Sequence, residues 1–215
     1  MFRVVEKMGQ VFLFSLDPEK AHALSLRALK SGALPNPEIV EDTRLEVSVA
    51  GLLFSNPLGM AAGYDKNADV PSALFKLGFG HVEVGTVTPL PQPGNAKPRI
   101  FRLPKDRGVI NRLGFNSLGH QHVAEILKSQ TLTDGLLGVN IGANKESGDF
   151  AADFVEGIQV FHDLAGYLTI NISSPNTPGL RNLQAAEVLQ QLLDRVMAAR
   201  DESASNQVPV LLKIA

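Results

Sequence analysis

The chain has 215 residues, of which 44% are hydrophobic and 20% charged, and its formal net charge is −2. These values describe a soluble globular protein with one large domain, and the near-neutral charge gives no support for nucleic-acid binding. The absence of cysteine excludes disulfides, thiolate metal ligands and a cysteine base, and the five histidines show no HExxH spacing, so we expect no metal site.

The N-terminal segment, residues 1–34, predicts a hairpin of two short helices. Apolar residues recur at spacings of three and four over residues 2–16. The second helix begins with Asp17 as its N-cap and Pro18 at its first position, and it ends near Gly32. Neither helix is long enough to span a bilayer, so their apolar faces must contact each other, the main domain or lipid. A helical cap on the main domain and a monotopic membrane patch both fit this pattern.

After this hairpin, a linker leads into a region where strands and helices alternate. Residues 35–44 contain prolines and predict the linker, while residues 45–49 and 52–54 predict a β-hairpin. Residues 88–112 are expected to be irregular, apart from an edge strand at residues 100–103. The strands expected in the alternating region are residues 58–62, 81–85, 136–139, 167–170 and 208–214. The helices expected between them are residues 70–77, 117–128, 150–162 and 185–200.

Strands that alternate with helices predict a parallel sheet, and we expect an α/β fold, a (β/α)8 TIM barrel, over residues 45–215. An open Rossmann sheet is the alternative, but no G-x-G-x-x-G follows the first strand. A complete barrel usually needs about 250 residues, and this chain stops inside a strand, so we expect a partial chain that ends after about five βα strands. In a barrel, the ends of these strands would surround one mouth. The strand ends are Gly63, Thr86, Asn140, Asn171 and Lys213.

The segment with the clearest functional signal is residues 167–181, Y-L-T-I-N-I-S-S-P-N-T-P-G-L-R. A buried strand leads into a polar stretch in which Pro175 and Pro178 prevent regular hydrogen bonding. We therefore expect a stiff β-to-α loop that directs hydroxyls and amides at one point, on the edge of the sheet that carries the chemistry in α/β folds. An ordinary turn rich in Asn, Ser and Pro is the alternative interpretation.

The other strand ends add a defined set of chemical groups. Residues 61–66 allow the backbone to approach a flat ligand and place Lys66 beside it, and Lys213 provides a second cation. Thr86 adds a hydroxyl, and residues 111–116 add amides in a tight glycine turn. Two lysines among neutral donors and acceptors suit an anionic, planar substrate and a flavin, whose reduced ring accumulates negative charge near a lysine. Glycoside hydrolysis, which requires two carboxylates, does not fit this set.

Eight motifs, in order along nearly the whole chain, resemble the class 2, quinone-dependent dihydroorotate dehydrogenases. Each motif alone is weak, but the complete set is highly specific. The motifs are L-D-P-E-K-A-H (residues 16–22), N-P-L-G-M-A-A-G-Y-D-K (56–66), G-T-V-T-P (85–89), P-R-I-F-R-L (98–103), N-R-L-G-F-N-S (111–117), V-N-I-G (139–142), N-I-S-S-P-N-T-P-G-L-R (171–181) and L-L-K-I-A (211–215).

This resemblance implies FMN-dependent oxidation of (S)-dihydroorotate to orotate, with a membrane quinone as acceptor, in de novo pyrimidine (UMP) biosynthesis. Ser174 matches the family's catalytic base, which takes the C5 proton while FMN accepts the C6 hydride; the companion class has cysteine there. The matches to substrate-binding positions are Lys66, Asn111, Arg112, Leu113, Gly114, Phe115, Asn171 and Asn176. The matches to flavin-binding positions are Ala62, Gly63, Tyr64, Asp65, Lys66, Thr86, Asn140, Asn171 and Lys213. The matches to positions that line the quinone tunnel are His22 and Arg102.

The resemblance also implies peripheral association with the cytoplasmic side of the bacterial inner membrane, through residues 1–34. A serine hydroxyl is a poor base at neutral pH, so Ser174 would need a dry pocket and a proton outlet through Thr177 or water. Two other readings of the sequence stay open. The first is a non-catalytic partial barrel that needs a further segment to bind FMN, and the second is a soluble relative that uses fumarate or NAD.

Overall fold

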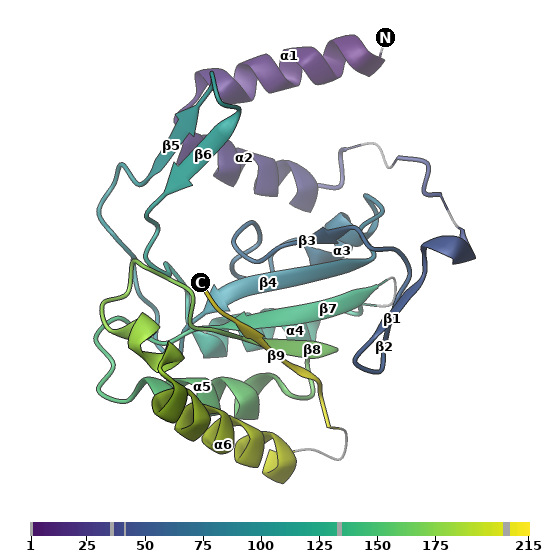
Figure 1. Cartoon of the computed structure of the whole chain (residues 1–215). Coiled ribbons are helices and arrows are strands. Elements are labelled where there is room, and N and C mark those ends of the chain that lie inside the picture. The colour runs from purple at the N-terminus through teal and green to yellow at the C-terminus, as the bar shows by residue number, and fades with distance from the viewer. Residues whose placement is uncertain (1, 35–36, 41, 133–134, 204–206) are drawn as a thin grey trace.

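The computed structural model describes residues 2–34, 37–40, 42–132, 135–203 and 207–215. Within these ranges, its centre is a five-stranded parallel sheet (Figure 1). The strands lie in the order β3 (Gly59–Met60), β4 (His81–Val87), β7 (Leu136–Ile141), β8 (Tyr167–Asn171) and β9 (Val210–Lys213). The sheet order therefore follows the chain order without a switch point, as in a TIM barrel and unlike a doubly wound sheet. Closure of the barrel stays a prediction.

Helices connect the strands, as the alternating pattern predicted. They are α3 (Pro71–Phe75), α4 (His120–Ser129), α5 (Phe150–Phe161) and α6 (Ala186–Ser203). Figure 1 shows α4, α5 and α6 together on one face of the sheet. Parallel strands require such crossover connections, and the helices bury the apolar face of the sheet.

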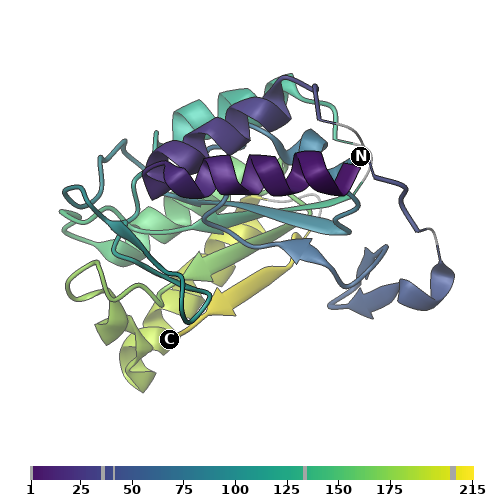
Figure 2. The same cartoon turned by 90° about the horizontal axis from the view of Figure 1, so that it is seen from above.

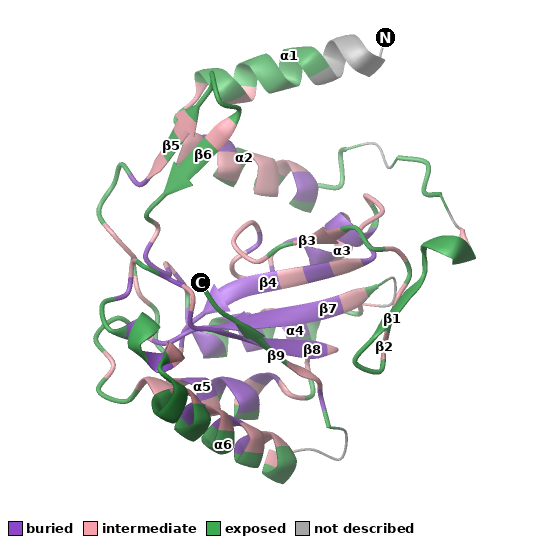
Figure 3. Ribbon diagram, in the orientation of Figure 1, coloured by how far each residue is buried: buried purple, intermediate pink, exposed green. Residues whose placement is uncertain are grey.

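The two faces of the sheet differ in chemistry because successive side chains of a strand point in opposite directions. The face under the helices supplies apolar residues to the core, and β4, β7 and β8 are buried along most of their length (Figure 3). These core residues are Val82, Val84, Val139, Ile141, Leu168 and Ile170. The opposite face carries Glu83, Asn140 and Thr169, which are joined by hydrogen bonds. A Cβ on Gly138 would lie only 2.1 Å from the Tyr167 ring, so glycine makes room for that ring.

The two helices predicted in the N-terminal segment are present as α1 (Phe2–Ser15) and α2 (Pro18–Lys30). Asp17 caps α2, since its Oδ1 accepts hydrogen bonds from the backbone N–H groups of residues 19 and 20 at 3.1 Å. In Figure 2, which views the molecule from above, the two helices lie in front of the sheet, and Figure 1 shows that α2 is the nearer of the two to it. They differ in burial, because α2 buries Ala21 and Leu29, whereas α1 is exposed along most of its described length (Figure 3).

Several local expectations need correction. The hairpin of β1 (Val47–Val49) and β2 (Leu52–Phe54) is confirmed, but residues 108–111 are not irregular. They form β6 (Gly108–Asn111), which pairs antiparallel with β5 (Ile100–Leu103). Such short strands are stabilised by their partner more than by their own sequence pattern, which explains why β6 was missed.

The remaining differences concern the ends of elements. Ser117 does not begin a helix, because it pairs with Gln92 in an isolated bridge and α4 starts at His120. In the predicted linker, residues 35, 36 and 41 lie outside the described residues, and Thr43 begins the 3-10 helix η1 (Thr43–Leu45). A second short 3-10 helix, η2 (Leu180–Gln184), lies before α6 and was not predicted.

Candidate active site

Three polar side chains at the carboxyl ends of adjacent strands form one hydrogen-bonded cluster. Thr86 of β4 donates from Oγ1 to Oδ1 of Asn140, near the end of β7, over 2.6 Å. Asn171, the last residue of β8, donates from Nδ2 to Thr86 Oγ1 over 3.0 Å and to Asn140 Oδ1 over 3.1 Å. All three residues are buried. The parallel sheet therefore brings these predicted site residues together, as expected for strand ends that share one edge.

Counting donors and acceptors shows which groups of this cluster can bind a ligand. Both Nδ2 hydrogens of Asn171 are used inside the cluster, and its Oδ1 accepts from the N–H and Oγ–H of Ser173 at 3.1 and 2.7 Å. Asn140 Oδ1 also accepts two hydrogen bonds, while Asn140 Nδ2 donates only to Glu83, over 2.7 Å. Among the described residues, the second N–H of Asn140 has no partner, so it is available to a ligand.

The loop after β8 holds Ser174 beside this cluster. Ser174 is 8% exposed, and its Oγ accepts a hydrogen bond from the backbone N–H of Asn176 over 3.2 Å. The Ser174 hydroxyl proton has no acceptor among the described residues, whereas the hydroxyl of Ser173 donates to Asn171. The buried Oγ1 of Thr177 likewise has no partner within the described part of the chain. Ser174 and Thr177 are therefore the two buried hydroxyls of this loop that can exchange protons with a ligand or water.

A second loop, between β3 and α3, lies against the end of β4. The N–H of Gly63 donates to the carbonyl of Gly85 over 2.8 Å, and the N–H of Gly85 donates to the carbonyl of Asp65 over 3.0 Å. The Asp65 side chain is fully buried, and its two oxygens accept from the backbone N–H groups of Asp69 and Val70 at 2.8 Å. Burial raises the pKa of Asp65. This carboxylate fixes the shape of the loop, so a flavin contact at Asp65 would have to come from its backbone.

Lys66 follows in the same loop and is the unpaired cation of the site. Within the described ranges, its amino group forms no hydrogen bond or ion pair. Burial lowers its pKa to about 8; the positive charge of Arg99 lowers the pKa further, and Glu19 opposes this effect. A lysine that is desolvated and lacks a counter-ion is suited to bind an anion.

A pocket of about 430 Å³ connects Lys66 with the N-terminal helices. Gly63 and Tyr64 line it from the β3–α3 loop, His22 from α2, and Arg102 from β5. The pocket thus joins residues predicted to bind flavin and substrate to residues predicted to line the quinone tunnel. Asn116 also lines this pocket, with a buried Oδ1 that has no partner among the described residues. Its amide belongs to the glycine-turn segment, residues 111–116, but Asn116 was not predicted as a site residue.

The predicted substrate segment 111–115 is only partly directed at this pocket. Leu113 lines it, and Asn111 lies exposed at the end of β6. The Arg112 guanidinium donates to the carbonyl of Pro98 at 2.9 and 3.2 Å and lies 5.6 Å from the centre of the Phe101 ring. Its side chain therefore stabilises the β5–β6 region.

The glycine turn in this segment brings an aromatic ring close to the strand ends. Gly114 has a φ of +70°, and a Cβ there would lie 2.8 Å from the Asn95 side chain, so the turn requires glycine. The following residue, Phe115, is 8% exposed, and its ring approaches Gly142 just beyond β7. The Phe115 ring thus helps to exclude water from the space beside Thr86.

The two predicted quinone-tunnel residues hold the N-terminal helices in place. His22 Nε2 donates to the carbonyl oxygen of Tyr64 over 2.7 Å, and Ser25 Oγ lies 2.9 Å from the Tyr64 hydroxyl. These contacts place α2 against the loop that carries Lys66. Arg102 donates to carbonyls at the end of α1, at 2.8 to 3.1 Å, and its guanidinium lies 4.9 Å from the centre of the Phe14 ring. It therefore caps α1, whose last carbonyls have no partner within the helix.

The remaining predicted residues lie at the edge of the site. Ala62 is partly buried, next to Gly63, and Asn176 supplies the N–H that contacts Ser174. Lys213 lies opposite Asn171 in the register of β8 and β9, and it is exposed. The carbonyl of Lys213 accepts a hydrogen bond from the N–H of residue 172 over 3.1 Å. Lys213 is thus beside the cluster, at the edge strand.

Sequence reasoning missed an ion pair that fastens α2 to the rest of the site. Arg99 is 6% exposed, and its guanidinium donates to both carboxylate oxygens of Glu19 at 2.6 and 3.1 Å. Arg99 also donates to the carbonyls of Pro93 and Asn95, and Lys97 lies 3.2 Å from Glu19. No short-range pattern connects Glu19 with Arg99, because they are 80 residues apart in the chain.

Replacing Glu19 by alanine should destabilise the fold by about 3 kcal/mol, because it leaves the buried Arg99 charge without its carboxylate. Chemical denaturation with and without the substitution measures this. Hydrogen bonding to Arg99, and then to Lys97, lowers the pKa of Glu19. The stabilisation is therefore complete above the ordinary value of 4.5, and it is lost as the pH falls through the lowered pKa.

A matched control is available at the other end of the same helix. Lys30 is 63% exposed and pairs with Asp69 over 2.9 Å, so Lys30→Ala should change stability by less than about 1 kcal/mol. Equal effects of the two substitutions would show that the Glu19–Arg99 pair contributes no more than an ordinary surface ion pair.

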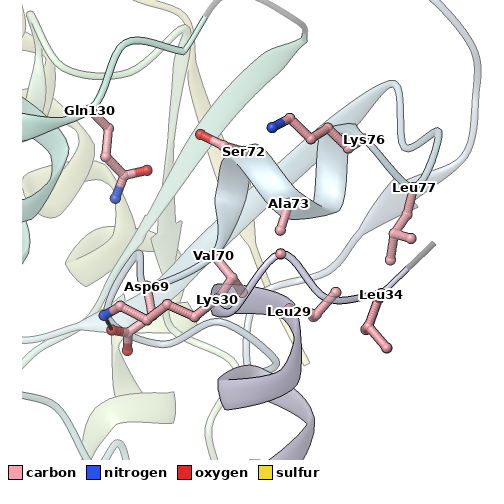
Figure 4. Close-up of a pocket in the computed structure, with 11 residues that line it drawn as sticks. Leu29, Lys30, Leu34, Asp69, Val70, Ser72, Ala73, Lys76, Leu77 and Gln130 are labelled. Atoms are coloured by element: carbon pink, nitrogen blue, oxygen red, sulfur yellow. Dashed lines mark hydrogen bonds and ion pairs between the residues drawn. The ribbon is translucent and has the colours of Figure 1, made fainter. Parts of the chain in front are cut away.

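The Lys30–Asp69 pair borders a second cavity, of about 260 Å³, at the end of α2 (Figure 4). The side chains that surround it include Leu29, Ala73 and Gln130, and none of the predicted site residues lines it. This cavity therefore lies outside the candidate active site.

Comparisons with known proteins agree with this geometry. The family model for dihydroorotate dehydrogenase matches residues 44–215. The dihydroorotate dehydrogenase (quinone) of Rhizobium rhizogenes strain K84 is 60% identical over 212 residues, which cover 97% of this chain and 58% of the relative. The corresponding protein of Rhizobium meliloti strain 1021 is 58% identical over 218 residues, which cover 100% of this chain and 60% of the relative. The chain thus spans less than two thirds of the length of these relatives.

Solved structures show the same similarity. A crystal structure of DHODH from Eimeria tenella in complex with ferulenol matches with a TM-score of 0.87 and 40% identity, over 93% of this chain and 59% of that one. The ligand-free protein from the same organism matches equally well, over 62% of its chain. Within the described ranges of our chain, no helix combines the length and apolarity needed to cross a bilayer.

Proposed function

This chain belongs to the dihydroorotate dehydrogenase family, and from that membership we propose that it takes part in FMN-dependent oxidation of (S)-dihydroorotate to orotate, with a quinone as electron acceptor, in pyrimidine biosynthesis. The observation that carries the proposal is the convergence of Ser174, the Thr86–Asn140–Asn171 cluster and the unpaired Lys66 at one edge of the sheet. High identity to quinone-dependent relatives supports the choice of acceptor.

The donor set at this edge fits a flavin. Asn140 offers one N–H that has no partner in the described part of the chain, and the loop from Ala62 to Lys66 offers a glycine at φ +111° with no described atom within 4 Å of an added Cβ. Lys66 supplies positive charge, and Thr86 and Lys213 lie near the carboxyl ends of β4 and β9. Bound FMN would supply the hydride acceptor and pass two electrons on to the quinone. The residues that would hold it are Ala62, Gly63, Tyr64, Asp65 through its backbone, Lys66, Thr86, Asn140, Asn171 and Lys213.

In this proposal, Ser174 removes the proton from C5 of dihydroorotate. Its hydroxyl is nearly buried, which keeps competing water away, and the proton would leave through the Thr177 hydroxyl of the same loop or through water. Lys66 binds the substrate's negative charge, and the groups that orient the ring come from the cluster and from the glycine turn. These residues are Asn111, Arg112, Leu113, Gly114, Phe115, Asn171 and Asn176.

The pocket between α2 and the β5–β6 hairpin is the proposed route for the quinone. It extends from Lys66 to His22 and Arg102, which hold the two N-terminal helices against the site. The exposed face of α1 carries Val11 and Phe12, at 70% and 55% exposure. Apolar side chains on an exposed helix support peripheral contact with the bacterial inner membrane, from which a long-chain quinone would enter.

Anaerobic reduction of the flavin tests the proposed function. The protein is purified, its FMN content is measured, and dihydroorotate is added while the flavin absorbance is followed. Loss of absorbance, then its return when a quinone is added, is the expected result. If FMN is bound but stays oxidised when dihydroorotate is added, the proposal is contradicted. If fumarate or NAD reoxidises the reduced flavin and a quinone does not, the proposed acceptor is wrong.

Lys66 makes the affinity for orotate depend on pH in a specific way. Burial lowers its pKa to about 8, so Lys66 loses its charge about two pH units below an ordinary lysine. Because the protonated form binds the anion, affinity should be constant below about pH 7 and should fall by up to about tenfold per unit above pH 8. Titration of orotate against the flavin absorbance at a series of pH values measures this.

The variant Lys66→Ala is the control for this dependence. It should bind orotate about 30-fold more weakly at pH 7, because it lacks a charge-assisted contact worth about 2 kcal/mol. Its affinity should also no longer fall between pH 7 and 9. If the wild-type affinity stayed constant up to pH 10, Lys66 would not be the group that binds the anion.

A further inference from the structure

Glu83 lies beneath the candidate site and has no part in any of the roles assigned above. It belongs to β4, and its carboxylate lies on the polar face of the sheet. Oε1 accepts from Nδ2 of Asn140 over 2.7 Å, and Oε2 accepts from Oγ1 of Thr169 over 3.1 Å. The carboxylate therefore bonds to side chains of both β7 and β8, directly below the cluster at the strand ends.

The Glu83 carboxylate determines which way the Asn140 amide points. Glu83 Oε1 is the acceptor of this hydrogen bond, so the Asn140 atom that faces it is the NH2 group. The Asn140 carbonyl oxygen then points the other way, where it accepts from Thr86 and Asn171. A flipped amide would place its NH2 group against the NH2 group of Asn171, with no acceptor between them.

One fixed amide determines the rest of the cluster. Because Asn140 Oδ1 accepts the Thr86 hydroxyl proton, the lone pairs of Thr86 Oγ1 are left to accept from Asn171. Asn171 then presents its NH2 group to both neighbours and its carbonyl to Ser173, whose backbone N–H can only donate, so the order of the cluster is held from both ends. The order of donors and acceptors thus extends from Glu83 to the loop that carries Ser174.

We propose that Glu83 is a positioning residue, whose carboxylate locks the Asn140 amide in one orientation and so prepares the hydrogen-bond directions of the strand-end cluster for the flavin. This inference rests on the proposed function, since it takes FMN as the ligand of that edge. A group that is already oriented loses less conformational freedom on binding, so the lock increases affinity without touching the ligand. This role requires an acceptor atom within hydrogen-bond distance of Asn140, and it does not require a negative charge.

Two conservative variants separate the effect of the length of the Glu83 side chain from the effect of its charge. Glu83→Gln loses the charge but can still accept from Asn140 and donate to the Thr169 hydroxyl. Glu83→Asp keeps the charge, but its side chain is one methylene shorter, so it cannot keep the 2.7 Å contact while β4 remains paired. Thr169→Val is the control, because it removes a second contact of Glu83 and leaves Asn140 bonded.

The measurement is the dissociation constant of FMN from each purified variant, by quenching of flavin fluorescence, together with the thermal unfolding midpoint without FMN. Glu83→Gln and Thr169→Val should bind FMN within about threefold of wild type, and Glu83→Asp should bind at least about tenfold more weakly. The unfolding midpoints should not follow this order, because a merely structural role would affect all three variants through stability.

The possible results can be told apart. If the wild-type protein does not bind FMN, the proposed function fails, whatever Glu83 does. If wild type binds FMN and Glu83→Asp binds equally well, or if Glu83→Gln loses as much affinity as Glu83→Asp, the positioning role is wrong. A loss in Thr169→Val as large as that in Glu83→Asp would also overturn it, because the effect would then belong to the sheet as a whole.

Discussion

Replacing Ser174 by alanine should slow reduction of the bound flavin by dihydroorotate by about 10²- to 10⁴-fold, the usual contribution of a general base. The structure gives the reason for choosing this hydroxyl. Ser174 is 8% exposed, and its proton has no acceptor among the described residues, so it can rotate toward a substrate. Stopped-flow measurement of flavin bleaching, at saturating dihydroorotate, isolates this step from quinone reduction.

The neighbouring residue provides the matched control. Ser173→Ala makes the same change one position earlier, but the Ser173 hydroxyl is already committed to Asn171 over 2.7 Å. It should reduce the rate by less than about tenfold. Ser174→Cys should retain more activity than Ser174→Ala, since a thiol ionises more readily than a hydroxyl. If Ser174→Ala bleached the flavin at the wild-type rate, or if Ser173→Ala lost more of that rate than Ser174→Ala, Ser174 would not be the base.

Removing residues 1–16, a range that includes α1, should lower turnover with a long-chain quinone by at least about 100-fold and leave reduction of the flavin nearly unchanged. Met8, Val11, Phe12 and Phe14 are 67%, 70%, 55% and 58% exposed. Full burial of such side chains contributes about 1.5–3 kcal/mol each, so even partial insertion of four gives a hundredfold effect on partition into lipid. Binding to vesicles, with turnover on a long-chain and on a short, water-soluble quinone, measures this.

The structure also shows where the truncation must end. Removing all of residues 1–34 would take away Glu19 and leave Arg99 buried without its carboxylate, so loss of activity could reflect unfolding. α1 is attached mainly through Arg102, which contacts its last carbonyls. If the protein without residues 1–16 still used the long-chain quinone at the full rate, α1 would be no more than a cap. An equal loss with the short quinone would mean that electron transfer itself is damaged.

The features that were predicted best are those that depend on residues close together in the sequence. The capping of α2 by Asp17 and the alternation of strands and helices depend on neighbouring residues, and both are confirmed. The 3-10 helix η2 and strand β6 were missed, because short elements depend on their partners more than on their own pattern. The strand ends are a long-range contact that could still be predicted. They were expected to meet because parallel strands share an edge, and Thr86, Asn140 and Asn171 do so.

The sequence by itself determined the alternation of strands and helices, the family and the candidate residues, because periodicity, caps and motifs are properties of short stretches. Only the tertiary structure decided what each side chain does. Arg102 binds carbonyls at the end of α1, and the Asp65 carboxylate binds backbone N–H groups of its own β3–α3 loop. Glu19 pairs with Arg99, which is 80 residues away in the chain. The tertiary structure also places Glu83 against Asn140, 57 residues away. Hydrogen bonds and ion pairs require atoms within about 3 Å, and the packing of the whole chain decides which atoms come that close.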